Sequence, residues 1–193
     1  AIATHRYLIT GGTIAPASID EQLESLDPAR RIASLTADGT GAPLDADLLA
    51  AAIDETTLAC AAILVGAGER MLSESVAYAK VREQFGQPIG EYQAVKHQLA
   101  DVRVALSFAR PLVQGAALSL GSADGPRDVS AAKVAAGDAA LLAARVALQV
   151  HGAIGYTEEH DLGIWITRAT ALDAAWGSTD HHRARIARAI LER

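Results

Sequence analysis

The sequence is poor in aromatic residues and cysteine, and each shortage narrows the possible fold or setting. Aromatic side chains make up 4% of the 193 residues, whereas 50% of the residues are hydrophobic, so aliphatic side chains must supply the core. Such a composition, rich in alanine, favours closely packed helices over a sheet-rich fold. The one cysteine, Cys60, cannot form an internal disulfide. This fits a reducing compartment, and we expect a cytoplasmic protein.

Basic runs and membrane-spanning apolar runs are also missing. The formal net charge is -6 at pH 7, which gives no reason to expect nucleic-acid binding. No apolar run reaches the length that crosses a bilayer, and no signal peptide opens the chain, so we expect no membrane span. The sequence begins at Ala1 and its one methionine is Met71. We therefore expect that residues preceding Ala1 are missing from it.

Patterns that bind metals or nucleotide phosphates are absent as well. None of the six histidines has a glutamate three residues before it, which argues against the Glu-x-x-His pairs of di-iron bundles. No cysteine and histidine spacing is typical of zinc sites. Residues 66–71 (GAGERM) lack the third glycine and the preceding strand of a dinucleotide fingerprint, so we interpret them as a packing contact within a helix. The sequence predicts no metal site.

A long helical region follows a short segment of different character. Apolar residues recur at helical spacing from residue 45 almost to the C-terminus, with Asp45 or Asp47 as the first cap and Ser178 or Thr179 as the last. Long helices joined by short loops predict an antiparallel four-helix bundle, so the fold class is mainly α. The predicted helices cover residues 45–84, 91–120, 128–150, 161–175 and 179–191.

The first 44 residues favour β structure. Residues 5–10 (HRYLIT) are aromatic and β-branched, and Gly11 with Gly12 ends this predicted strand. Residues 30–36 (RRIASLT) form a second candidate strand. Because two short strands make no stable sheet alone, we expect this segment to dock onto something larger.

The stretch Val81–Gln93 (VREQFGQPIGEYQ) ends the first predicted helix. Gly86 stands where a C-cap glycine belongs, and Pro88 follows two residues later. Arg82 suits the negative end of the helix dipole. These residues alone predict a helix stop.

The wider sequence around this stretch resembles the acyl-CoA dehydrogenase family. Residues 78–101 (YAKVREQFGQPIGEYQAVKHQLAD) are similar to the pattern YA-x-x-R-x-QFG-x-PI-x-x-FQ-x-x-x-H-x-LAD of its C-terminal domain, and residues 149–162 (QVHGAIGYTEEHDL) resemble its Q-x-x-GG-x-G-[FY] segment. The resemblance covers roughly residue 27 to the C-terminus. It implies that residues 1–44 are the end of a middle β domain and residues 45–193 a C-terminal helical bundle domain.

The resemblance implies a flavoprotein that introduces a Cα–Cβ double bond into an acyl-CoA thioester, in lipid or sterol side-chain breakdown. In this family a carboxylate takes the α-proton while FAD accepts a hydride. The adenine-diphosphate half of FAD lies at a subunit interface. The resemblance therefore implies acyl-CoA as substrate and a related acyl-CoA dehydrogenase subunit as partner, in a hetero- or homo-oligomer that is a dimer or a tetramer.

The family motifs also imply which residues contact the cofactor. Arg82 matches the arginine on the FAD pyrophosphate, and a guanidinium group pairs well with phosphate oxygens. Phe85 matches an aromatic residue that packs against the cofactor, and Ala153 replaces the usual second glycine of the second motif. The implied cofactor-binding residues are Arg82, Gln84, Phe85, Ile89, Tyr92, Gln93, Gln149, Gly152 and Ala153.

The proton-abstracting residue departs from the family pattern. Most members carry a glutamate in a segment like YEGT before the last helix, and here Trp176 stands at that position. Other members place the base on the first long helix, which makes Glu55 the candidate, near Thr57, where an arginine that contacts CoA is expected. We interpret the chain as an FAD-supporting subunit without the catalytic glutamate. Two alternatives stay open: a competent enzyme that uses Glu55, and an interaction bundle that has lost flavin.

Overall fold

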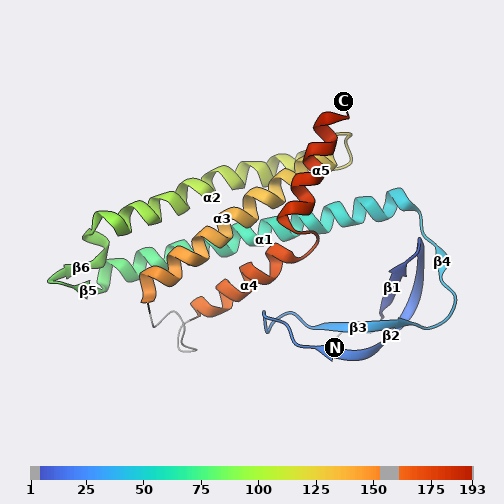
Figure 1. The fold of residues 1–193 in the computed structure, drawn as a ribbon, viewed down its shortest axis with the longest axis horizontal. Helices are drawn as coiled ribbons and strands as arrows, with labels where there is room; N and C mark the ends of the chain where they lie inside the picture. Colours follow the sequence, from blue (N-terminus) through green and yellow to red (C-terminus); the bar gives the residue numbers. More distant parts are fainter. Residues whose placement is uncertain (1–4, 153–160, 193) are drawn as a thin grey trace. The chain divides into compact units, whose positions relative to one another are not determined.

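Helices dominate the structure. The computed structural model describes residues 5–152 and 161–192. The helices in this part of the chain are α1 (Ala46–Val81), α2 (Gln93–Ser119), α3 (Gly125–His151), α4 (Leu162–Ala174) and α5 (Thr179–Leu191). Figure 1 shows α1, α2 and α3 as long helices that run side by side, with the shorter α4 and α5 beside them. The predicted mainly α fold, a helical bundle after a short β part, is confirmed.

The helix ends follow from local chemistry. Asp45 caps α1, because its Oδ1 accepts backbone N–H groups of the first turn at 2.8 and 3.0 Å. Ser178 caps α5 through the N–H of His181, at 3.3 Å. α3 begins at Gly125, earlier than predicted, because Pro126 in its first turn needs no N–H partner there.

The β part contains two strands that the sequence did not reveal, the long β2 and the two-residue β4. The strands are β1 (Tyr7–Thr10), β2 (Thr13–Leu23), β3 (Ile32–Ala37) and β4 (Ala42–Pro43), and β2 pairs antiparallel with the other three. β2 was missed because it contains Pro16, a poor strand former, and because the pairing with β3 is irregular between Ile19 and Glu21. The predicted end of the first strand is confirmed: β1 stops before Gly11 and Gly12, which at φ 55° and 77° join it to β2.

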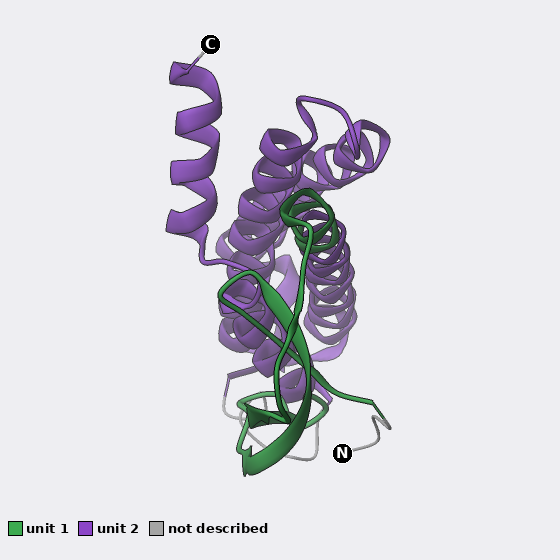
Figure 2. Ribbon diagram, turned by 90° about the vertical axis from the view of Figure 1, so that its right-hand side faces the viewer, with its two compact units in different colours: residues 1–53 green, residues 54–193 purple. Residues whose placement is uncertain are grey.

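The chain divides into two compact units, residues 1–53 and 54–193, which Figure 2 shows in different colours. The division falls inside α1, so the first turns of this helix belong with the sheet. The boundary that we predict between residues 44 and 45 stays a prediction.

Small side chains build the core of residues 54–193. Buried residues from α1, α2, α3 and α4 form one cluster, to which α3 contributes a run of alanines. Gly68 shows how closely the helices approach, because a Cβ atom there would lie 2.8 Å from Cδ2 of Leu106. The shortage of aromatic residues is therefore matched by close helix packing.

Helix α1 is long and apolar enough to cross a membrane by length and composition, with a mean hydropathy of 1.8 over its most apolar window. This corrects the expectation that no apolar run reaches that length. The same property is found in core helices of bundles, and Leu64 and Met71 of α1 are fully buried in the shared core. Packing within the bundle therefore accounts for part of the apolar character of α1.

Candidate cofactor edge and base-position loop

A tight hairpin, not a continued helix, carries the first family motif. Helix α1 ends at Val81, and β5 (Glu83–Gln84) pairs antiparallel with β6 (Gln87–Pro88). Phe85 and Gly86, at φ 53° and 85°, form the two-residue turn between them. These angles are typical of a type I′ hairpin turn. The predicted role of Gly86 as a helix C-cap is wrong, because the glycine serves the hairpin instead.

Phe85 is the most unusual residue of this hairpin. Its side chain is 94% exposed, and its backbone lies in the left-handed region that Gly, Asn and Asp tolerate better. Such a conformation costs about 1–3 kcal/mol, and such residues cluster at functional sites. An exposed aromatic ring on a strained turn is therefore a candidate ligand contact.

Arg82 joins α1 to the hairpin and is fixed through its backbone. Its N–H donates to the carbonyl of Tyr78 at 2.9 Å, and its carbonyl accepts the N–H of Ile89 at 2.7 Å. The side chain is exposed and has no hydrogen bond or ion pair within the described part of the chain. The backbone is thus held on both sides, while the guanidinium group stays available to an anion.

The residues that follow the hairpin brace it. A short 3-10 helix (Ile89–Glu91) leads into α2, and the Tyr92 hydroxyl donates to the carbonyl of Gln84 at 2.9 Å. Ile89 is half-buried against the core. Gln93 is exposed, and its Nε2 lies 2.7 Å from Nε2 of His97. Tyr92 therefore supports the turn, and Gln93 and Gln84 lie at its solvent side.

The second family motif lies at the end of α3. Gln149 is exposed, and Gly152, at φ 61°, caps the helix by donating its N–H to Leu148. Ala153 lies outside the described residues. The rings of Tyr78 and His151 stack with centroids 4.5 Å apart and an interplanar angle of 24°. This stack brings the end of α1 and the end of α3 together, and both lie at the same end of the bundle in Figure 1.

The loop between α4 and α5 carries Trp176, the position at which the sequence resemblance predicts the family's base. Trp176, at φ 60°, and Gly177, at φ 104°, both have left-handed backbone conformations. The Trp176 side chain is 51% exposed. A Cβ atom on Gly177 would lie 2.7 Å from Nε2 of His182, so this loop passes very close to α5.

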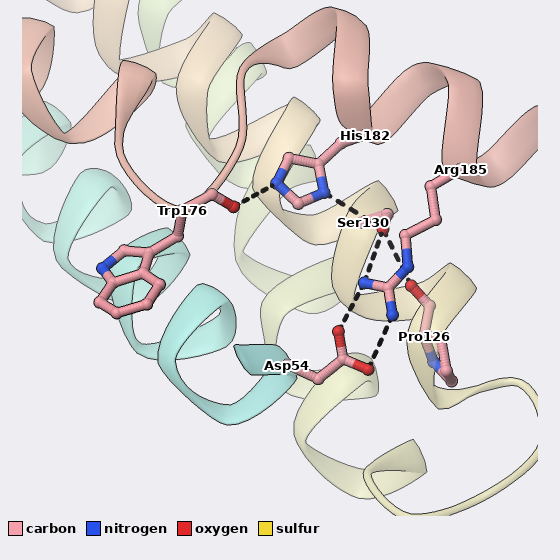
Figure 3. Close-up of polar contacts among 6 residues, drawn as sticks. All are labelled: Asp54, Pro126, Ser130, Trp176, His182 and Arg185. Carbon is pink, nitrogen blue, oxygen red and sulfur yellow. Dashed lines mark hydrogen bonds and ion pairs between the residues drawn. The ribbon is translucent and has the colours of Figure 1, made fainter. Parts of the chain in front are cut away.

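Figure 3 shows that buried polar side chains hold this loop. Nε2 of His182 lies 3.0 Å from the Trp176 carbonyl oxygen, and because a carbonyl only accepts, Nε2 carries the proton. Nδ1 of His182 then faces the Ser130 hydroxyl at 3.2 Å. The same hydroxyl also reaches the Pro126 carbonyl at 2.9 Å. His182 thus connects the loop to α3.

An ion pair joins the same network to α1. Arg185 makes two hydrogen bonds to the Asp54 carboxylate, at 2.5 and 2.9 Å, and a longer one of 3.4 Å to Ser130. Asp54 is buried, whereas the neighbouring Glu55 is exposed on α1. Thr57, at the position where an arginine for CoA is expected, is fully buried. The Asp54 carboxylate is therefore part of a structural ion pair with Arg185.

Sequence reasoning missed the residues of this network. Ser130, His182 and Arg185 lie on α3 and α5, and the partner of Arg185 lies 131 positions away in the sequence. One signal was available: His182 and Arg185 are three residues apart, which places them on one face of a helix. Their partners on α1 and α3 could not be identified without the fold.

Burial lowers the pKa of His182 below its usual value, and the hydrogen bond to the Trp176 carbonyl opposes this shift. Electrostatic interactions with Lys133 on α3, and with His181 and Arg185 on α5, lower the pKa of His182 further, and Arg185 is itself paired with Asp54 of α1. A lowered pKa means that the folded state binds fewer protons than the unfolded state. The stability that neutral His182 contributes is therefore expected to be fully present above about pH 6.5, the ordinary histidine pKa. It is expected to be lost as the pH drops through the lowered value.

The test compares the free energy of unfolding of the protein and of a His182→Gln variant across this range. Glutamine can still donate an N–H to the Trp176 carbonyl but does not titrate. We expect the variant to show a smaller loss of stability on acidification. Equal losses in both proteins would show that His182 does not carry this pH dependence.

Dehydrogenases of known structure share this fold. The chain belongs to the acyl-CoA dehydrogenase family of flavoprotein oxidoreductases, because the sequence profile of "Acyl-CoA dehydrogenase, C-terminal domain" matches residues 47–191. It is 40% identical over 149 residues to acyl-CoA dehydrogenase IpdE2 of Mycobacterium tuberculosis, which covers 77% of this chain and 45% of that protein. It is 34% identical over 131 residues to the 3-sulfinopropanoyl-CoA desulfinase of Paraburkholderia xenovorans, which covers 68% of this chain and 34% of that protein.

Solved structures of acyl-CoA dehydrogenases also superpose on this chain. The Tcur3481–Tcur3483 steroid ACAD superposes with a TM-score of 0.86 and 26% identity, covering 93% of this chain and 51% of that chain. A glutaryl-coenzyme A dehydrogenase bound to glutaryl-CoA gives a TM-score of 0.84 and 26% identity, covering 93% of this chain and 50% of that chain. The chain thus spans about half the length of its structural relatives and less than half the length of the two sequence relatives.

Proposed function

We propose that this chain is part of an FAD-dependent acyl-CoA dehydrogenase and is the subunit that supports FAD without removing the α-proton. The observation that carries the proposal is Trp176, which holds an indole on the loop where the family resemblance expects a glutamate. Arg82 and Phe85, by contrast, are exposed and available to a cofactor. The cofactor edge is retained in this chain while the base is replaced.

The exposed residues fit the adenine-diphosphate half of FAD. An arginine fork suits pyrophosphate oxygens, and the Phe85 ring offers a flat apolar surface to a base. Gly152 presents backbone without a side chain at the end of α3. When bound, FAD accepts the hydride from the acyl group. The residues of this chain would bind and orient its outer edge.

The groups around Trp176 support the assignment of proton removal to another chain. An indole nitrogen donates a hydrogen bond and cannot accept a proton at neutral pH. Asp54 is held by Arg185 through two hydrogen bonds. Thr57 is buried, so it does not replace the arginine that is expected to contact CoA. A partner subunit would then supply both the base and the CoA contact.

Names among the relatives support a related partner and a lipid or sterol substrate. The steroid ACAD with the same fold carries two protein names, Tcur3481 and Tcur3483. The sequence relatives include proteins named acyl-CoA dehydrogenase and one named a desulfinase, so membership alone does not fix the reaction. The proposed partner is a related acyl-CoA dehydrogenase subunit, and the proposed substrate is an acyl-CoA.

The test is to purify the whole protein alone and together with a co-expressed acyl-CoA dehydrogenase subunit that a neighbouring gene encodes. We expect acyl-CoA to reduce FAD only in the joint preparation. Full oxidation of acyl-CoA by the lone protein would contradict the proposal. A joint preparation without the absorbance of flavin would instead indicate an interaction bundle that has lost its cofactor.

Replacing Glu55 with glutamine is expected to leave turnover of the joint preparation unchanged, because the partner supplies the base. The competing possibility is a competent enzyme that uses Glu55, and the exposure of this side chain on α1 is what favours it. Acyl-CoA-dependent flavin reduction measures the difference, with Glu74→Gln on the same helix as a control. Loss of turnover in the Glu55 variant alone would identify Glu55 as the base.

A further inference from the structure

We infer that the stacked rings of Tyr78 and His151 are positioning residues that hold the two cofactor-facing segments of this chain in register. The segments are the Arg82–Pro88 hairpin after α1 and the Gln149–Gly152 end of α3. This inference rests on the proposed function, which assigns both segments to FAD. It adds two residues to which neither family motif assigns a cofactor contact.

Tyr78 acts on the hairpin through its backbone and on α3 through its ring. Its carbonyl accepts the N–H of Arg82 at 2.9 Å, so the main chain of the arginine is anchored directly to Tyr78. The Tyr78 ring is half-buried and packs against the core. A shift of this ring would therefore move the point at which the hairpin leaves α1.

His151 is fixed in the same way at the end of α3. Only 3% of it is exposed, and its Nδ1 lies 2.8 Å from the carbonyl oxygen of Ala147. Because the carbonyl only accepts, Nδ1 carries the proton, and this hydrogen bond sets the orientation of the ring. Gly152 follows directly and Gln149 lies two residues before, so the His151 ring controls the position of both.

The stack adds an aromatic contact between two segments that separate hydrogen bonds brace, beside the apolar core that α1 and α3 share. Tyr92 ties the hairpin to the start of α2 through Gln84, and Gly152 caps α3 through Leu148. Neither contact connects the hairpin with α3. The rings of Tyr78 and His151 lie 4.5 Å apart at their centroids and nearly parallel, which is a favourable aromatic geometry. A ligand that contacts both segments at once needs their separation to be constant.

The experiment measures the affinity of the assembled, flavin-depleted protein for FAD by titration of flavin fluorescence. Tyr78→Leu and His151→Leu are each expected to weaken FAD binding about twofold to tenfold, the range that an aromatic pair supports. The double variant is expected to be no weaker than either single variant, because both remove one shared contact. Tyr78→Phe keeps the ring and is expected to retain the affinity of the original protein.

Val129→Ala separates positioning from a general loss of stability. Val129 is fully buried at the opposite end of α3, in a second apolar cluster, so this variant lowers the melting temperature away from the cofactor edge. We expect it to bind FAD normally. If Tyr78→Leu weakens FAD binding no more than Val129→Ala at equal loss of stability, the positioning role is wrong.

Arg82→Ala separates this inference from the proposed function. If Arg82→Ala weakens FAD binding and Tyr78→Leu does not, the ring pair is not a positioning element, and the assigned FAD edge stands. If neither variant weakens FAD binding, the assignment of this edge to FAD fails, and the inference fails with it.

Discussion

Replacing Asp54 with alanine is expected to lower the free energy of unfolding by about 3–5 kcal/mol, because it leaves the Arg185 guanidinium inside the protein without its counter-ion. The Asp54 side chain is 9% exposed and the Arg185 side chain 24%. Two hydrogen bonds, at 2.5 and 2.9 Å, are lost together. Chemical denaturation monitored by circular dichroism measures the change.

A second ion pair of α5, made by Arg183, provides a matched control. Arg183 pairs with Asp138 at 3.1 Å, but both side chains are more than half exposed. Asp138→Ala is therefore expected to change stability by at most about 1 kcal/mol, as for other surface ion pairs. Similar losses in the two variants would show that burial of the Asp54–Arg185 pair is not what makes it important.

The location of this pair gives it a role beyond stability. Arg185 also reaches Ser130, and Ser130 contacts His182, whose ring holds the Trp176 carbonyl. The loop with its left-handed residue 176 is thus tied to α1, α3 and α5. In our proposal this framework is retained around a position that no longer carries a base.

The helices could be predicted from the sequence because their signals are local. Apolar spacing and a capping residue lie within a few residues of each other, and Asp45 and Ser178 cap the helices as expected. Strand β2 could not be predicted in this way. Its identity comes from pairing with β1, β3 and β4, and its own sequence includes Pro16 and two acidic residues.

The residues of the candidate site also differ in whether their signals are local in the sequence. Arg82 and Phe85 were found because they stand within a continuous motif. The same motif was misread locally, since Gly86 suits both a helix cap and a hairpin turn, and pairing of Gln84 with Gln87 decides between them. The contacts of His182 and Arg185 depend on chain segments that meet only after folding.

Replacing Arg82 with alanine is expected to weaken FAD binding by the assembled protein about tenfold to a hundredfold. A charge-assisted hydrogen bond contributes about 1.5–3 kcal/mol, and this free energy corresponds to that range of dissociation constants. The Arg82 side chain is exposed and has no partner of its own within the described residues, so its removal leaves no buried group unsatisfied. The melting temperature of the flavin-free protein is therefore expected to stay unchanged. Titration of flavin fluorescence and thermal denaturation measure the two effects separately.

Two further variants show whether charge or geometry is responsible. Lys80→Ala removes a neighbouring exposed positive charge from the last turn of α1, so it tests long-range attraction alone. Arg82→Lys keeps the charge but loses the planar fork that binds two phosphate oxygens together. We expect Lys80→Ala to bind FAD normally and Arg82→Lys to lose most of the affinity. Equal weakening by Lys80→Ala and Arg82→Ala would mean that the hairpin attracts FAD only through its net charge, and a direct contact of Arg82 with the pyrophosphate would be excluded.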